Sequence, residues 1–273
     1  MKIPMVVALA LAAAGLLQQP APPAPAPVDA ARVAAAASAW TTRFERSLSG
    51  LLFRERYVQK YMQGGSSRQT HLEANIFLLK ASPTEPFVLY RDVYQADGRA
   101  VKSHTKRLQE ILTTSAPSWM SEARRLTEAS ARYNAGFGRR TVNVPTMPLE
   151  YLAPARVAGL AFKDSGEAPV TVGGLDVVVI EFTETARPTL VRGAGRRDLP
   201  ARGRYWIHAA SGAVVRAFVE FVGRGHVEVE YALHETLGVW VPVKMTDVIS
   251  GVTGVAEYDE FQRVVVSTKD AIK

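Results

Sequence analysis

The sequence predicts an α+β fold in which a strongly curved, mainly antiparallel β-sheet carries helices on its concave side. Three observations predict this fold. A helical hydrophobic period near the start of the chain gives way to strand-like alternation, a second helical stretch interrupts the strands, and from residue 156 onward short strand patterns follow one another. A flat sandwich would leave the helical stretches without a surface to cover, so a curved sheet accounts better for this order.

The beginning of the chain predicts export. Lys2 precedes an apolar run that ends at Leu17, which fits the apolar core of a secretory signal and is too short to span a bilayer. We therefore expect a Sec-type signal peptide over residues 1–19, a Pro/Ala linker over residues 20–28 and a single domain over residues 29–273, in the periplasm or otherwise exported. Several cleavage sites fit, and an uncleaved N-terminal anchor is the alternative.

The first helix is predicted to begin near Asp29, a good N-cap residue, because apolar residues then recur at spacings of three and four. From Leu52 the period changes to two, as in a strand with one buried face, and Gly64-Gly65-Ser66 ends this strand. The helical stripe consists of Val33, Ala37, Trp40, Phe44, Leu48 and Leu51.

Two further strands are predicted over residues 69–79 and 87–95, since both runs are rich in β-branched and aromatic residues. Two short helical stripes follow, over residues 108–112 and 119–133.

The second half of the chain reads as about seven strands separated by Gly, Pro or Asp. A hairpin turn is predicted at Ala210-Ser211-Gly212. The clearest alternation runs from His226 to His234 and predicts one buried and one solvated face. The buried face should carry Val227, Val229, Tyr231 and Leu233.

Several classes of active site are excluded. The chain has no cysteine, hence no disulfide and no thiolate nucleophile or metal ligand. The run that begins at His234 starts like a zinc-protease helix, but Gly238 stands where the second histidine is required. No serine-nucleophile motif and no phosphate-binding glycine loop occurs, because Asp198 replaces the third glycine after Gly193-Ala194-Gly195. We therefore expect no catalytic residue, no metal, no cofactor and no enzymatic activity.

The charge distribution indicates an anionic partner. The formal net charge is +7, and six arginines stand between Arg187 and Arg204 against one acid, Asp198. No zinc-finger, basic-zipper or RNP-like pattern occurs, so nucleic acid is not expected. Arginine forks bind phosphate and carboxylate, so this stretch could contact an anionic membrane surface or an acidic protein; a merely solvated loop is the alternative. The candidate contact residues are Arg192, Arg196 and Arg197.

Glu55 shares a strand face with Phe53 and Tyr57. If that face points inward, a carboxylate is buried among aromatic residues and requires a partner. A position at an open rim, in contact with a ligand, is the other interpretation.

A family resemblance is found in three runs, GRYWIHAASGAVVR from Gly203, EVEYALHETLGVWVPVKM and GVAEYDEFQRVVV. Together they resemble the C-terminal meander of the bacterial outer-membrane lipoprotein-sorting carriers, the LolA/LolB-like superfamily. The resemblance implies a half-barrel sheet of about eleven strands with helices as a lid over a cavity for acyl chains. The arginine-rich stretch and the helical stretch from Ser103 to Asn134 depart from the pattern, and no residue matches a carrier's functional residues, so only the fold and the cavity are carried over.

These observations lead to two hypotheses. The first is a periplasmic carrier that holds the acyl chain of a lipid or lipoprotein in an apolar cavity. The second is a non-enzymatic envelope module, an interaction partner or a sensor, with a filled core. For the carrier, the expected ligand-binding residues are Val227, Val229, Tyr231, Val243, Met245, Tyr258 and Phe261.

Overall fold

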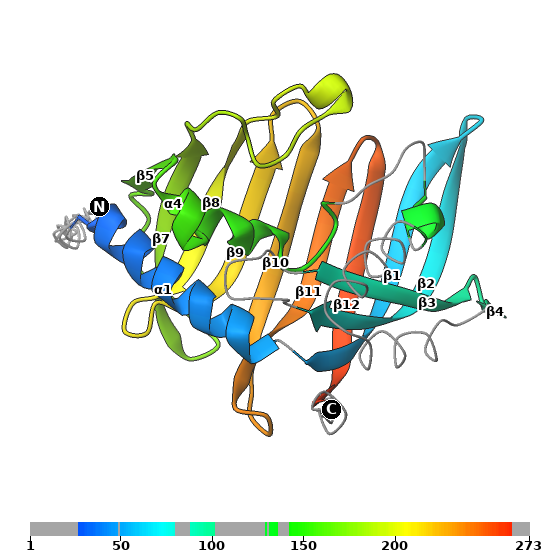
Figure 1. The fold of residues 1–273 in the computed structure, drawn as a ribbon, viewed down its shortest axis with the longest axis horizontal. Coiled ribbons are helices and arrows are strands. Elements are labelled where there is room, and N and C mark those ends of the chain that lie inside the picture. Colours follow the sequence, from blue (N-terminus) through cyan, green and yellow to red (C-terminus); the bar gives the residue numbers. More distant parts are fainter. Residues whose placement is uncertain are drawn as a thin grey trace, which may run out of the picture.

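The computed structural model describes residues 27–48, 50–79, 88–101, 129, 131–135 and 142–263. All strands of these residues belong to one 12-stranded sheet, and one long helix and several short ones lie along one of its faces (Figure 1). The predicted signal peptide (1–19) and the first predicted helical stripe (108–112) lie outside the described residues, as do most of the linker and most of the second stripe.

The helical elements are α1 (Ala30–Leu48), the short 3₁₀ helices η1 (Ala131–Tyr133), η2 (Met147–Leu152) and η3 (Ala194–Arg196), and α4 (Pro154–Val157). The strands are β1 (Leu51–Gln63), β2 (Ser66–Leu79), β3 (Val88–Ala96), β4 (Arg99–Ala100), β5 (Leu160–Asp164), β6 (Val170–Val172), β7 (Leu175–Glu184), β8 (Ala201–His208), β9 (Val214–Phe221), β10 (Gly225–His234), β11 (Val239–Ile249) and β12 (Val252–Arg263).

The sheet consists of two antiparallel meanders that meet at one pair of strands. Its order is β4-β3-β2-β1-β12-β11-β10-β9-β8-β7-β5, and β6 also pairs with β7. Every pairing is antiparallel, and within the described residues β4 forms one edge of the sheet while β5 and β6 form the other. The structure thus confirms a mainly antiparallel, curved sheet that does not close into a barrel.

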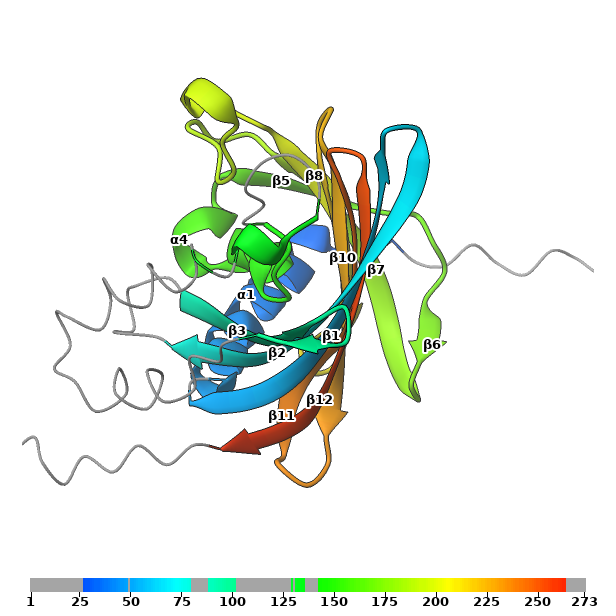
Figure 2. The same cartoon turned by 90° about the vertical axis from the view of Figure 1, so that its right-hand side faces the viewer.

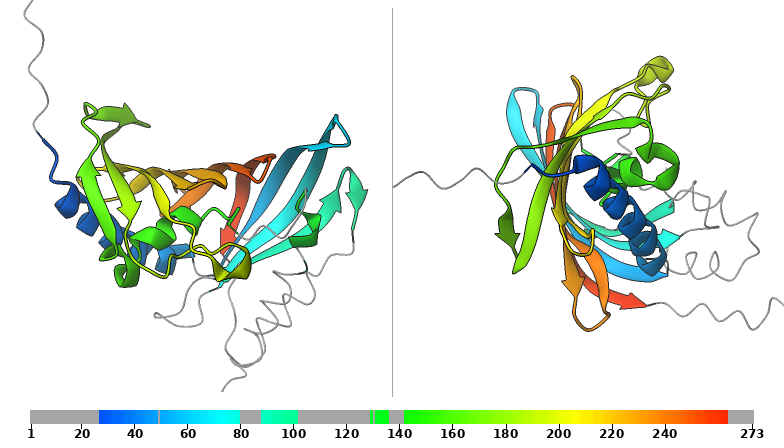
Figure 3. Two further views of the ribbon diagram at one scale, coloured as in Figure 1. Left: turned by 90° about the horizontal axis from the view of Figure 1, so that it is seen from above. Right: turned by 90° about the vertical axis from the view of Figure 1, so that its left-hand side faces the viewer.

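The sheet curls toward the side on which α1, η2 and α4 lie, as β1, β2 and β3 show most clearly (Figures 2 and 3). Register shifts interrupt four of the pairings, for example between Leu52 and Arg54 and between Glu230 and Tyr231. Bulges of this kind bend strands and increase their twist. The prediction that helices cover the concave side is confirmed.

Helix α1 begins as predicted, because the Asp29 carboxylate accepts a hydrogen bond from the backbone N–H of Arg32 at 3.0 Å. It ends at Leu48, earlier than the helical stripe predicts, since Gly50 adopts a left-handed φ of 76° and Leu51 already begins β1. The predicted stripe faces the sheet through Trp40, Phe44 and Leu48, all buried.

The prediction for Leu233 is wrong. Val227, Val229 and Tyr231 are buried as expected, but Leu233 is 52% exposed. The reason is the length of the β10–β11 hairpin: the pairing of β10 with β9 ends at Glu230, so the outer part of the hairpin extends past the neighbouring strand.

Candidate ligand-binding face

The seven residues predicted to bind an acyl chain all lie on β10, β11 and β12. Five of them are buried, whereas Val243 and Phe261 are half-buried. Val229 pairs directly with Met245, and the Tyr258 hydroxyl donates to Met245 Sδ at 3.7 Å. Sequence reasoning therefore selected residues that belong to one apolar core cluster.

Several of these residues surround a fork in the sheet. In the described chain, β11 and β12 pair only from Ile249 and Val252 to Lys244 and Glu257, and the strands separate beyond that point. Aromatic rings of β1, β10 and β12 contact one another in this part of the sheet. The ring centroids are 5.7 Å apart for Phe53 and Tyr258, 5.1 Å for Phe53 and Phe261, and 5.6 Å for His234 and Phe261.

Helix α1 lies across the concave face and packs against β5, β7, β9 and β11. The Phe44 ring meets the Tyr231 ring edge-on at 5.6 Å, and Trp40 meets Trp240 edge-on at 6.0 Å. The rest of the buried face of α1 consists mainly of alanine, serine and threonine. The helix is thus held by few large side chains.

Two carbonyls of the chain from Pro145 to η2 accept hydrogen bonds from tyrosine hydroxyls of the sheet and complete this cover. Tyr231 donates to the Pro145 carbonyl at 2.8 Å, and Tyr205 donates to the Pro148 carbonyl at 2.7 Å. Burial raises the pKa of both phenols well above the ordinary value, so they remain protonated donors.

The other part of the concave face contains a buried ion pair. Glu55 is fully buried, and Arg91 Nε and Nη2 bind its two carboxylate oxygens at 2.7 and 2.8 Å. Burial is the largest single effect and lowers the pKa of Arg91, but the attraction and hydrogen bond of Glu55, together with Tyr258 and Tyr57, outweigh it, and the pKa lies above the ordinary value. Glu55 therefore faces inward and has a structural partner, Arg91, which sequence reasoning missed.

Arg91 also holds a segment over the sheet, because its Nη2 donates to the carbonyl of Asn143 at 3.1 Å. The Asn143 amide donates to the Tyr57 hydroxyl at 3.2 Å, and this hydroxyl donates to Asp247 at 2.5 Å.

A second stretch of chain is held on the same part of the sheet, because Gln59 accepts from the backbone N–H of Ala135 at 2.9 Å. We call residues 131–135 and 142–146 the strap; polar side chains of the sheet hold it in place.

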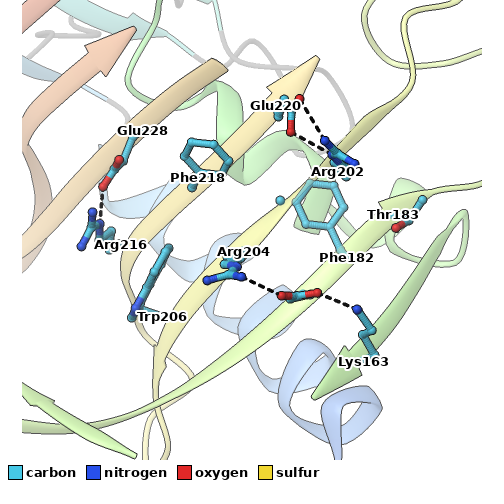
Figure 4. Close-up of a pocket in the computed structure, with 12 residues that line it drawn as sticks. Lys163, Phe182, Thr183, Arg202, Arg204, Trp206, Arg216, Phe218, Glu220 and Glu228 are labelled. Carbon is cyan, nitrogen blue, oxygen red and sulfur yellow. Dashed lines mark hydrogen bonds and ion pairs between the residues drawn. The ribbon is translucent and has the colours of Figure 1, made fainter. Parts of the chain in front are cut away.

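The outer face of the sheet carries a basin of about 710 Å³ over β5, β7, β8, β9 and β10 (Figure 4). Its arginines are paired with glutamates: Arg202 with Glu220 at 2.8 Å, Arg204 with Glu181 at 3.0 Å, and Arg216 with Glu228. The basin is therefore a layer of compensated charge on the side of the sheet opposite α1.

The three arginines predicted to contact a membrane or an acidic protein lie elsewhere. Arg192, Arg196 and Arg197 are exposed in the loop between β7 and β8. The structure does not bring them together with the seven apolar residues.

No group of three or more metal-ligating side chains occurs among the residues that the structure describes. Within the same part of the chain, no helix has the length and apolar character needed to cross a membrane.

Solved structures similar to this chain are distant in sequence. A DUF1329 family protein from Desulfovibrio piger is 12% identical, with a TM-score of 0.41, over 87% of this chain and 95% of that one. A LolA superfamily protein from Nitrosomonas europaea is 11% identical (TM-score 0.36; 87% and 94%), and a putative outer membrane lipoprotein-sorting protein domain from Vibrio parahaemolyticus is 9% identical (TM-score 0.36; 82% and 91%). No protein-family model and no curated protein matches the chain.

Proposed function

We propose that this protein is an exported, non-enzymatic carrier that binds the acyl chain of a lipid or lipoprotein on the apolar concave face formed by β10, β11 and β12. The observation that supports the proposal is the cover of this face. Helix α1 lies on the β10 and β11 part of this face through large side chains and a row of small ones, and a flexible acyl chain can replace such contacts because hydrophobic contacts are not directional.

The exchange is close to balanced in energy. Trp40, Phe44 and Leu48 are buried against the sheet, and burying a large apolar side chain stabilises a protein by about 1.5–3 kcal/mol. An acyl chain of about fourteen carbons contributes roughly 10 kcal/mol at about 0.8 kcal/mol per buried methylene, before ordering costs. A bound chain can therefore offset the loss of the α1 contacts.

The test fastens α1 to the sheet. The Arg43 guanidinium donates to the carbonyl of Ser211 at 3.4 Å, and both residues are exposed. Because the chain has no cysteine of its own, Arg43→Cys with Ser211→Cys can be joined by a short thiol crosslinker without competing reactions. The crosslinked protein should bind a fluorescent fatty acid about tenfold or more weakly than the same variant before crosslinking. The reason is that α1 can then no longer leave the sheet to make room for the acyl chain.

The matched control places the same crosslinker on the outer face. Arg202→Cys with Glu220→Cys joins neighbouring positions of β8 and β9 and leaves α1 free. Its fatty-acid affinity should not change on crosslinking. Equal affinity of the α1-crosslinked protein, or no fatty-acid binding by the unmodified protein, would overturn the proposal.

The filled concave face favours a second candidate, an envelope interaction or sensor module. The apolar residues beneath α1 pack against it, and Tyr231 and Tyr258 are 4% and 5% exposed. Under this alternative, protein purified from an envelope fraction contains no lipid in native mass spectrometry and retains an associated protein.

A further inference from the structure

The loop between β7 and β8 presents three arginines at its tip. This loop, drawn in yellow-green, rises above the end of the sheet on the side where α1 and α4 lie (Figure 2). Its tip reads Arg192-Gly-Ala-Gly-Arg196-Arg197, and all three arginines are exposed. The guanidinium groups are therefore gathered on a short projection at the rim of the concave side.

The backbone of the loop is held in place by two carboxylates. Glu184 accepts hydrogen bonds from the N–H groups of Leu190 at 2.7 Å and Ala201 at 3.1 Å. Asp198 accepts from the backbone N–H of Thr189 at 3.0 Å, and this bond is the main reason why the pKa of Asp198 lies below its ordinary value. The two acids at the base of the loop thus fix its shape.

The tip arginines differ from the arginines of the outer basin because they are not paired with glutamates in the described part of the chain. Arg202, Arg204 and Arg216 each bind a glutamate. Among the residues that the structure describes, the tip arginines form no such ion pair, and Asp198, the only acid of the stretch, is engaged by Thr189 and lies 3.7 Å from Arg187. Arg192 is attracted by Asp198 without forming an ion pair, and no acid is paired with Arg196 or Arg197 in the described part of the chain. The tip therefore presents positive charge that is only partly compensated, on a loop of fixed shape.

We propose that this tip docks the protein on a membrane surface of anionic phospholipids, with Arg192, Arg196 and Arg197 binding lipid phosphates. Guanidinium groups bind phosphate in two-pronged hydrogen bonds. The tip contains only glycine and alanine besides arginine, so it lacks the large aromatic or aliphatic anchor that dominates most protein interfaces. A membrane surface requires no such anchor, because each basic side chain near it adds to the attraction.

This inference deepens the proposed carrier function and rests on it, since it names the surface where the acyl chain is taken up or delivered. The experiment measures cosedimentation of the full-length mature protein with vesicles of phosphatidylglycerol and phosphatidylcholine. The triple variant Arg192→Gln, Arg196→Gln, Arg197→Gln should bind these vesicles roughly a hundredfold more weakly at low salt. Added salt should weaken the binding of the unmodified protein, because it screens charges on the surface.

The matched control removes three arginines from the basin, in Arg202→Gln, Arg204→Gln, Arg216→Gln, so that both variants have the same net charge. The inference predicts a much smaller loss for this control. Equal losses in both variants would overturn it, because net charge alone would then explain binding, as would equal binding to pure phosphatidylcholine. Capture of an acidic protein by the tip, without vesicle binding, would also overturn it.

The two proposals can fail separately. Binding of a soluble fluorescent fatty acid is measured without vesicles, and the triple tip variant should retain it. Fatty-acid binding without vesicle binding refutes the docking surface alone. Absence of fatty-acid binding refutes the carrier proposal, whatever the vesicles show.

Discussion

The concave face is covered in two different ways. Over β10 and β11, α1 rests on the sheet through apolar contacts such as Phe44 on Tyr231. Over β1 and β3, the strap is held by directed hydrogen bonds with Arg91 and Gln59, and it also reaches β10, where Pro145 accepts from Tyr231. Apolar contacts can be exchanged for any apolar group, whereas buried hydrogen bonds must be replaced one by one. The difference suggests a replaceable cover over one part of the sheet and a fixed cover over the other.

The largest expected effect comes from the fixed part. Arg91→Met leaves the Glu55 carboxylate buried without its cation and should lower the free energy of unfolding by about 3–5 kcal/mol. Urea unfolding measures the loss. The double variant Glu55→Leu, Arg91→Met removes both charges and should recover most of it. A single variant as stable as the double would show that the pair does not anchor this region.

A smaller and more informative change is expected in the replaceable part. Phe44→Ala should lower the free energy of unfolding by about 3 kcal/mol, because a large buried ring is lost. The same variant should bind the fluorescent fatty acid more tightly than the unmodified protein, since less contact energy opposes displacement of α1. Arg91→Met should not gain affinity. A gain in both variants, or in neither, would remove the distinction between the two parts.

The hydrogen bond between Tyr57 and Asp247 tests how the strap is held. Tyr57→Phe removes a hydroxyl that donates to Asp247 and accepts from Asn143. We expect a loss of about 1–3 kcal/mol in urea unfolding, the usual cost of leaving a buried polar group with fewer partners. Faster amide exchange should accompany it in residues 142–146 and not in α1. Faster amide exchange in α1 alone would show that this hydrogen bond does not hold the strap.

The smallest effect is expected for the same Arg–Glu chemistry on the outer face. The hydrogen bond from Arg202 holds the pKa of Glu220 below its ordinary value, against a smaller opposing effect of desolvation. Stability from this pair is present above the unfolded pKa of Glu and is lost as the pH falls through the lowered folded pKa. A carboxyl NMR titration should show a midpoint below the ordinary value, and Arg202→Gln should raise it while leaving the urea midpoint at pH 7 nearly unchanged.

Hydrophobic periodicity predicted most of the fold. The stripe of α1, the inward face of β1 and the alternation of β10 all depend on local spacing, and the structure places them as expected. Leu233 was predicted wrongly because its exposure depends on where the neighbouring strand β9 ends. The spacing of residues within β10 gives no information about that end.

The candidate site was less predictable for the same reason. Glu55 could be recognised as a buried carboxylate, but its partner Arg91 lies on β3, separated from β1 by β2. In β3 the successive residues Tyr90, Arg91 and Asp92 are all buried, so no alternation marks the arginine as inward. The fork between β11 and β12 likewise depends on pairing between strands, and no residue pattern within either strand shows it.

The meeting of β1 and β12 at the middle of the sheet has a consequence for biogenesis. A polypeptide synthesised from its N-terminus completes β1 to β4 early, yet the inner edge of β1 has no neighbour until the last strand has been made. Such late, long-range pairing slows folding and leaves an open edge that invites aggregation. A chain that ends before β12 would leave this edge of β1 unpaired, and we expect it to aggregate more readily than a chain that includes β12.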